Sequence, residues 1–192
     1  MPLQSEKNSL RQELKTRRDW LKENKGPFGC ELEKHFLSAF SLPVGSIVAG
    51  FLPIQSEPDL LTLLSTLHEQ GITVCLPEIE GKHTPLNFRK WAPTDNLKDG
   101  PYGLKEPEKA AENLLPTHML VPCIAVDKSG FRLGYGAAYY DITLNRYPAG
   151  KRPVTIAVAY DDLVVPKVPC EDHDIAVDYI LTETGCTKVG TA

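Results

Sequence analysis

The sequence lacks the features that mark membrane, secreted and nucleic-acid-binding proteins. No apolar run approaches the ~20 residues that cross a bilayer, and the stretch MPLQSEKNSLRQELK has no apolar secretory core. Acidic residues (25) outnumber Lys and Arg (21), which gives a formal net charge of −4 and no basic excess for general nucleic-acid binding. We therefore expect a cytoplasmic protein that binds neither membranes nor nucleic acid.

Cysteine is scarce and scattered. The five cysteines are widely spaced and form no Cys-x-x-Cys pair, which indicates reduced thiols and no disulfide framework. The stretch CEDHD at 170–174 lacks the second cluster that a zinc site needs, so we expect His173 to orient a loop. No Gly-x-Ser-x-Gly elbow is present, and neither a serine nor a thiol nucleophile is indicated.

Apolar runs that alternate with helical patterns are present along the whole chain. Helices are expected over 5–25, 28–40, 57–70 and 136–147, and strands over 46–53, 72–77, 86–91, 118–127, 152–160 and 176–183. The region 92–116 is rich in Pro, Gly and acids and predicts a loop with at most a short helix. Strands that are apolar on both faces favour a mainly parallel sheet covered on both sides. We predict a single three-layer α/β/α domain over residues 1–192.

A glycine-rich turn, SGFRLGYGAAYYD at 129–141, follows one of the predicted strands. Gly134 and Gly136 would let the backbone approach an anion closely, and the N–H groups of a following helix would converge on a phosphate. Arg132 would add a charge-assisted contact, and Asp141 a carboxylate for Mg²⁺. The turn is neither a Walker motif nor a complete G-x-G-x-x-G fingerprint. A phosphate site and a plain tight connection are both consistent with this pattern.

The turn also carries a resemblance to a known family. RLGYGAAYYD resembles the R-x-G-x-G-x-G-Y-Y-D signature of the 5-formyltetrahydrofolate cyclo-ligase family. Four more stretches resemble that family in the same order, between Lys7 and Glu183: KNSLRQELKTRR, FLPIQSEPD, WAPTDNLKDGPYGLKEP and EDHDIAVDYILTE. The resemblance implies a fold similar to that of sugar-phosphate isomerases and CoA transferases. It also implies a role in folate and one-carbon metabolism.

The reaction implied by the resemblance is an ATP- and Mg²⁺-dependent cyclisation. It converts 5-formyltetrahydrofolate to 5,10-methenyltetrahydrofolate and releases ADP and phosphate. The formyl oxygen attacks the γ-phosphate, N10 closes the ring on the activated carbon, and phosphate leaves. Positioning and charge neutralisation are the protein's share of such a reaction.

Two cations and a loop are assigned to ATP by this resemblance. Lys7 and Arg11 correspond to cations that meet the ATP phosphates, and their i, i+4 spacing places both on one helix face. The nucleotide loop corresponds to Arg132, Leu133, Gly134, Tyr135, Gly136, Ala137, Ala138, Tyr139 and Tyr140. Without the resemblance, Lys7 and Arg11 also fit a solvated helix face.

Substrate and metal contacts are implied in the same way. Leu52, Glu57 and Tyr135 correspond to residues that contact the folate, and Asp141 and Asp178 correspond to acids at Mg²⁺. From the residues alone, Glu57 also fits a first-turn helix acid, and Asp178 fits a carboxylate that caps a turn at a strand end. No residue is assigned as a general base.

Two alanines depart from the family loop. Ala137 and Ala138 stand where the family has a basic residue or further glycine, and Ile142 replaces a frequent arginine. If the alanines adopt positive φ, each costs ~1 kcal/mol or more. We expect them instead in the first turn of the helix, where alanine is favourable and its N–H groups remain available.

Two other functions remain open at this point. One is another phosphate-handling enzyme of the same fold, such as a sugar-phosphate isomerase, which would not need ATP. The other is a non-catalytic folate- or nucleotide-binding module, which would bind without turnover. We expect a monomer that acts on a small molecule.

Overall fold

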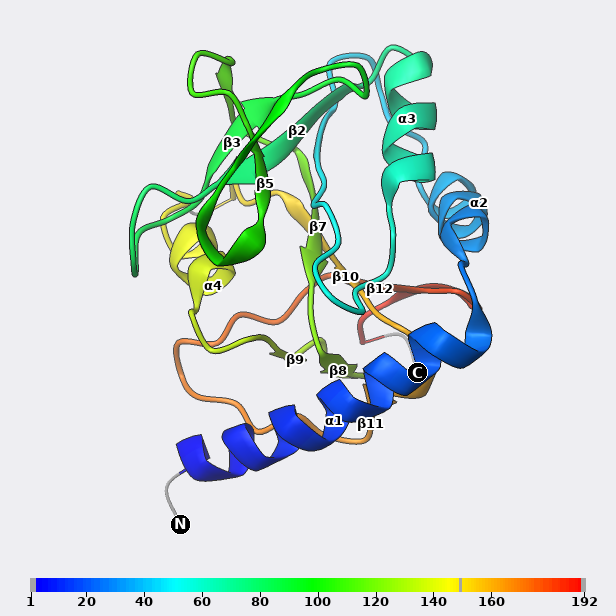
Figure 1. The fold of residues 1–192 in the computed structure, drawn as a ribbon, viewed down its shortest axis with the longest axis vertical. Helices are drawn as coiled ribbons and strands as arrows, with labels where there is room; N and C mark the ends of the chain where they lie inside the picture. Colours follow the sequence, from blue (N-terminus) through cyan, green and yellow to red (C-terminus); the bar gives the residue numbers. More distant parts are fainter. Residues whose placement is uncertain (1–2, 149, 191–192) are drawn as a thin grey trace.

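The architecture is known from a computed structural model that describes residues 3–148 and 150–190 (Figure 1). Its largest sheet has eight strands: β1 (Ile47–Ala49), β2 (Thr73–Glu78), β3 (Asn87–Lys90), β6 (Asn113–Leu114), β7 (His118–Pro122), β10 (Val154–Val158), β12 (Tyr179–Thr182) and β13 (Gly185–Lys188). Their order across the sheet is β13-β12-β10-β7-β1-β2-β3-β6. The central strands from β12 to β2 pair in parallel, whereas β13, β3 and β6 are antiparallel. The mainly parallel sheet is thus confirmed.

Helices lie on both faces of this sheet. The α-helices found in the described residues are α1 (Leu3–Lys25), α2 (Gly29–Ala39), α3 (Leu61–Glu69) and α4 (Tyr139–Leu144). Figure 1 shows α2 and α3 on one side and the short α4 on the other. Successive residues of β1 accordingly belong to different cores, with Val48 in the cluster of α1 to α3 and Ala49 in the cluster that contains Leu144. This explains why the strands are apolar in consecutive positions.

Helix α1 is long and mostly polar. Its buried side chains are Lys7, Leu14, Arg18 and Leu21, and Gly26 follows its end with φ 71°. No helix within residues 3–148 and 150–190 combines the length and the apolar character needed to cross a bilayer. All five cysteines are free, as the sequence predicted.

The region 92–116 contains a β-hairpin that the sequence did not reveal. Strands β4 (Leu97–Asp99) and β5 (Lys105–Pro107) pair around a 3₁₀ turn, η1 (Pro101–Gly103). Glu106 fixes the hairpin to the end of β2, because its carboxylate accepts the N–H of Ile79 at 2.9 Å. Glu78, which is buried, accepts a charge-assisted hydrogen bond from Lys98 at 2.9 Å. Three-residue strands leave too little alternation for periodicity to detect.

A small second sheet carries the glycine-rich turn. It consists of β11 (Val164–Val165), β8 (Ala125–Asp127) and β9 (Arg132–Leu133), and a 3₁₀ turn, η2 (Asp161–Leu163), precedes β11. Strands β8 and β9 are antiparallel, so the chain continues beyond β7 into β8, reverses after β8 and returns along β9. The turn between β9 and α4 is thereby held at the end of β7.

Candidate functional site

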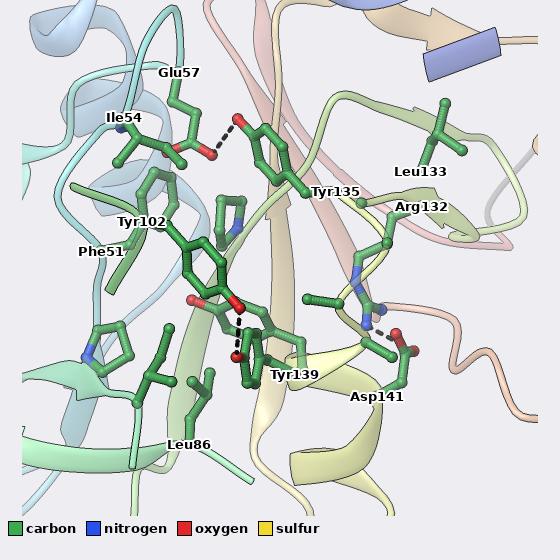
Figure 2. Close-up of a pocket in the computed structure, with 18 of the residues that line it drawn as sticks. Phe51, Ile54, Glu57, Leu86, Tyr102, Arg132, Leu133, Tyr135, Tyr139 and Asp141 are labelled. Atoms are coloured by element: carbon green, nitrogen blue, oxygen red, sulfur yellow. Dashed lines mark hydrogen bonds and ion pairs between the residues drawn. The ribbon is translucent and has the colours of Figure 1, made fainter. Parts of the chain in front are cut away.

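A cavity of about 470 Å³ opens where β1, β2 and β7 end (Figure 2). Its walls include Leu52 after β1, Pro77 in β2 and Pro122 at the end of β7. Strand β1 lies between β2 and β7, and the chain order of the parallel strands reverses there. Open α/β sheets bind ligands at this kind of switch point, outside the carboxyl ends of the strands. The volume is within the range of small-molecule sites.

Nearly all the site residues expected from the sequence line this cavity. They are Lys7, Arg11, Leu52, Glu57, Arg132, Leu133, Gly134, Tyr135, Gly136, Ala137, Ala138, Tyr139, Tyr140 and Asp141. Asp178 is not among the lining residues. Helix α1, the segment after β1 and the glycine-rich turn, which are far apart in the sequence, therefore meet at one cavity.

One part of the cavity is apolar and aromatic. Phe51, Ile54 and Leu86 lie there in Figure 2. Tyr102 of the β4–β5 hairpin approaches Tyr139 across the opening, with their hydroxyl oxygens 3.4 Å apart. The hydrogen bond with Tyr102 raises the pKa of Tyr139 to about 12, so Tyr139 is neutral at physiological pH. This wall suits a flat, largely apolar ligand.

Another part is densely charged, beginning with Lys7. Its Nζ donates to Glu171 at 3.0 Å and to Asp174 at 2.6 Å. Burial would lower the pKa of Lys7, but the two carboxylates outweigh it and raise that pKa. Burial would likewise raise the pKa of Asp174, and the Lys7 ammonium together with the N–H of Glu171 lowers it instead. The pair is therefore fully ionised near neutral pH.

A second ion pair holds Asp141. Arg132 donates to its Oδ1 at 2.7 Å and to the carbonyl of Ile175 at 2.7 Å. The same Oδ1 accepts the N–H of Ile175 at 3.0 Å, which places Asp141 beside the residue that follows Asp174. The structure thus gathers Asp141, Asp174 and Glu171 with Lys7 and Arg132. Glu171 and Asp174 were overlooked, although the stretch EDHDIAVDYILTE contains both.

Asp178 lies elsewhere. Its Oδ2 accepts the N–H and the hydroxyl of Thr155 at 2.8 and 2.7 Å, and its Oδ1 accepts from Arg152 at 3.0 Å. These contacts tie the beginning of β12 to the beginning of β10, away from the strand ends that form the cavity. Asp141 and Asp178, expected to share Mg²⁺, therefore do not line the same cavity. Asp178 instead holds a strand end, which is the alternative left open by the sequence.

The CEDHD stretch provides two carboxylates to the site and no zinc cluster. His173 is 62% exposed in its side chain and lies 3.8 and 3.9 Å from the carboxylates of Glu171 and Asp174. Within the described part of the chain, no group of three or more His, Cys, Asp or Glu side chains is arranged to hold a metal ion. The carboxylates of Asp141 and Asp174 are oxygen ligands of the type that Mg²⁺ accepts alongside waters and phosphate oxygens.

The glycine-rich turn departs from expectation at Ala138. This residue has φ 55° and ψ 16° and precedes α4, so the expectation that both alanines lie in the first helical turn is wrong. The chain needs left-handed residues here to reverse into the helix, as Gly136 at φ 96° also shows. The last glycine before the tyrosines in the family signature corresponds to Ala138. Arg11 covers the turn, since its Nε donates to the carbonyl of Gly134 at 2.8 Å.

Replacing Ala138 by glycine should stabilise the protein. Alanine in the left-handed region is strained, and glycine relieves that strain, so the free energy of unfolding should rise by about 1 kcal/mol. Ala137→Gly is the matched control, because Ala137 has no positive φ and glycine only adds freedom to the unfolded chain there. Thermal denaturation of both variants checks this. Equal melting temperatures for the two would contradict the assignment of strain to Ala138.

Glu57 faces the cavity near its apolar wall. Its Oε1 accepts the hydroxyl of Tyr135 at 2.7 Å, and its Oε2 accepts the N–H of Ile54 at 2.9 Å (Figure 2). Burial raises the pKa of Glu57, and these two donors and the charge of Arg18 oppose the rise. Glu57 precedes α3 by several residues, so it is not a first-turn acid of that helix. Arg18, buried on α1, was not anticipated from the sequence.

Known proteins resemble this chain over most of its length. The sequence profile of the 5-formyltetrahydrofolate cyclo-ligase family matches residues 3–183. The 5-formyltetrahydrofolate cyclo-ligase of Mycolicibacterium smegmatis is 39% identical over 146 residues, which cover 72% of this chain and 74% of the relative. That of Saccharomyces cerevisiae is 35% identical over 145 residues, covering 64% and 68%.

A solved structure agrees with these relatives. The NMR structure of Aquifex aeolicus 5,10-methenyltetrahydrofolate synthetase matches with a TM-score of 0.78 at 28% identity, covering 97% of this chain and 94% of that one. The shared fold and the matching sequence stretches lead to one assignment. This chain belongs to the 5-formyltetrahydrofolate cyclo-ligase family.

Proposed function

We propose that the protein is a ligase that cyclises 5-formyltetrahydrofolate to 5,10-methenyltetrahydrofolate, with ATP as co-substrate and Mg²⁺ as its metal ion. The observation that carries the proposal is the joining of two chemistries in one cavity. An apolar and aromatic wall with the buried carboxylate of Glu57 lies beside the cations Lys7, Arg11 and Arg132. The first part suits a folate ring, and the second suits a triphosphate.

The cations at the phosphate end come from two elements. Lys7 and Arg11 project from α1, and Arg132 from β9. Lys7 and Arg132 are each held by a carboxylate at the cavity. Phosphate oxygens would bind these cations, while Gly134, Gly136 and their neighbours let the backbone approach the nucleotide.

We assign the metal to Asp141 and Asp174 rather than to Asp141 and Asp178. Asp141 and Asp174 line the cavity, and Asp178 does not. Mg²⁺ supplies neutralisation of the charge that develops on the transferred phosphoryl group. Arg132 and the N–H of Ile175 fix the direction of the Asp141 carboxylate, so that ligand is oriented before the metal arrives.

The chain's contribution to the chemistry is positioning. The formyl oxygen would form a bond to the γ-phosphorus as ADP leaves. N10 would then bond to the formyl carbon and lose its proton to water, and the C–O bond would break to release phosphate. Glu57 and Leu52 would hold the folate at one end, and the cations would hold the triphosphate at the other. Fixing two reactants in one cavity removes much of the entropic barrier of a bimolecular step.

The proposal also covers the fold, the domain organisation and the location of the protein. The strand order around β1 and the helices on both faces support a sugar-phosphate isomerase/CoA transferase-like fold. The family match over residues 3–183 supports a single domain. A monomer in the cytoplasm remains a prediction. The family match favours the cyclo-ligase over a sugar-phosphate isomerase.

The decisive experiment is a spectrophotometric assay of the purified protein with 5-formyltetrahydrofolate. Growth of the near-ultraviolet absorbance of the methenyl product, dependent on both ATP and Mg²⁺, is the expected result. Binding of folate or ATP without growth of this absorbance would point to the non-catalytic module. Growth that is independent of ATP would refute the proposed reaction.

Arg11→Ala should weaken the binding of MgATP about tenfold or more and change folate affinity little. The guanidinium lies over the glycine-rich turn, and a charge-assisted hydrogen bond contributes about 1.5–3 kcal/mol. Calorimetric titration with each ligand separates the two effects. An equal loss of affinity for both ligands would contradict the placement of Arg11 at the phosphates.

A further inference from the structure

A fully buried arginine occupies the apolar stripe of α1. Arg18 has a relative exposure of 0% and lies between the buried residues Leu14 and Leu21 on the same helix face. Taking a guanidinium out of water is costly, and an apolar side chain of similar size often packs there without loss of stability. Packing alone therefore does not account for an arginine at this position.

The hydrogen bonds of Arg18 lead to neutral acceptors. Nε donates to the hydroxyl of Ser56 at 3.0 Å, one terminal nitrogen to the carbonyl of Cys123 at 3.2 Å, and the other to the hydroxyl of Tyr135 at 2.5 Å. Each of the two hydroxyl groups in turn donates a hydrogen bond to a carboxylate: Ser56 donates to Asp19, and Tyr135 donates to Glu57. The charge of Arg18 is thus compensated through two hydroxyl groups.

The direction of the hydrogen bonds from Arg18 to Glu57 follows from which groups can donate. A guanidinium is only a donor, so the Tyr135 oxygen accepts from Arg18 and its single proton is free for Glu57. The other oxygen of Glu57 accepts the N–H of Ile54. Both oxygens of Glu57 therefore accept hydrogen bonds, as an ionised carboxylate does.

The surroundings of Glu57 otherwise disfavour its charge. Burial is the largest influence and raises the pKa of Glu57, whereas the N–H of Ile54, the hydroxyl of Tyr135 and the charge of Arg18 lower it. Burial raises the pKa of Tyr140 and of the Cys123 thiol, and the charge of Glu57 adds to both rises. Arg18 is the cation whose charge lowers the pKa of Glu57, and it does so from α1.

We propose that Arg18 is a positioning residue for substrate binding: acting through the Tyr135 hydroxyl, it keeps Glu57 ionised and aimed at the cavity. The inference rests on the proposed function, in which Glu57 contacts the folate. A fixed carboxylate accepts two adjacent N–H donors on the edge of a heteroaromatic ring, and a protonated one cannot. Arg18 itself is too deeply buried to touch a ligand, whereas Tyr135 is 39% exposed and lines the cavity.

The test is calorimetric titration of 5-formyltetrahydrofolate and of MgATP, each from mildly acidic to neutral pH. Tyr135→Phe removes only the hydroxyl. We expect folate affinity to fall about tenfold at neutral pH, with MgATP affinity unchanged within about twofold. The pH below which folate binding is lost should rise by about one pH unit. A tenfold change in an equilibrium constant corresponds to one pKa unit.

Arg18→Met should show the same pH shift as Tyr135→Phe. Arg18→Lys, which keeps a positive charge, should show a smaller shift. The double variant Arg18→Met/Tyr135→Phe should bind folate no more weakly than Tyr135→Phe alone, because both substitutions interrupt the same chain of hydrogen bonds. Arg17→Met is the matched control: Arg17 is the neighbouring arginine, its side chain is 54% exposed, and its contact is with Asp162 at the surface. This control should leave the pH dependence of folate binding unchanged.

The outcomes separate the positioning role from the proposed function. A wild-type protein that fails to bind folate would overturn the proposed function itself. If the wild type binds folate normally and Tyr135→Phe loses folate binding at the same acidic pH as the wild type, the positioning role alone is overturned. The same conclusion follows if Arg17→Met shifts the pH dependence of folate binding as much as Tyr135→Phe does. Thermal denaturation shows whether Arg18→Met is folded, and if it is not, Tyr135→Phe decides the question.

Discussion

Asp141→Asn is expected to lower turnover about a hundredfold and to shift the Mg²⁺ titration to higher concentrations. The substitution removes a carboxylate charge that Arg132 and the N–H of Ile175 hold at the cavity. It also leaves the Arg132 guanidinium, whose side chain is only 5% exposed, without its ionised partner. Loss of one partner of a buried pair is destabilising, so the folded fraction must be checked by thermal denaturation before rates are compared.

Asp178→Asn provides the matched control. One carboxylate oxygen of Asp178 accepts from Thr155 and the other accepts from Arg152, so an asparagine oxygen keeps the contacts with Thr155 while its amide group gives up the exposed contact with Arg152. Its Mg²⁺ dependence should match that of the wild type, with a modest loss of stability. If instead Asp178→Asn shifts the Mg²⁺ titration and Asp141→Asn does not, the assignment of the metal to Asp141 and Asp174 is wrong.

Lys7→Met is expected to weaken MgATP binding about a hundredfold, because it removes a cation from the phosphate end of the cavity. It should also lower the free energy of unfolding by about 1–3 kcal/mol, since Asp174 and Glu171 lose the ammonium group between them. Isothermal titration calorimetry and urea denaturation measure the two effects.

The stability difference caused by Lys7→Met should depend on pH. Lys7 lowers the pKa of Asp174, so the stabilisation is complete above the ordinary pKa of an aspartate. It is lost as pH falls through the lowered value, because a protonated carboxyl no longer needs the cation. Lys15→Met, which alters the same helix outside the cavity, should show neither effect. A stability difference that persists at strongly acidic pH would contradict the ion pair.

Most of the residues that the sequence assigned to a site line one cavity in the structure, for a physical reason. Parallel strands covered on both faces are apolar in consecutive positions, so they are easily found, and their carboxyl ends meet at one edge. A helix turn brings residues four apart onto one face, so Lys7 and Arg11 could be placed together without knowing any tertiary contact. The structure places both at the cavity.

The sequence could not distinguish the acids of the last stretch that resembles the family. Asp174 and Asp178 both lie in EDHDIAVDYILTE, and which one faces the cavity depends on how the turn before β12 folds. Arg18 was hidden for a similar reason, because an arginine in a charged helix normally faces water. The left-handed backbone of Ala138 was also unpredictable from the alanine itself, which ordinarily favours helix.

Lys7 meets Asp174 at a sequence separation of 167 residues. On the ribosome, α1 emerges long before the segment that carries Asp174, so a nascent chain presents Lys7 without its partners. Contacts of such separation form only after a large loop has closed. We therefore expect the cavity end lined by Lys7 and Asp174 to form late in folding, so that ATP, as the proposed ligand, would selectively stabilise chains whose two ends have already come together.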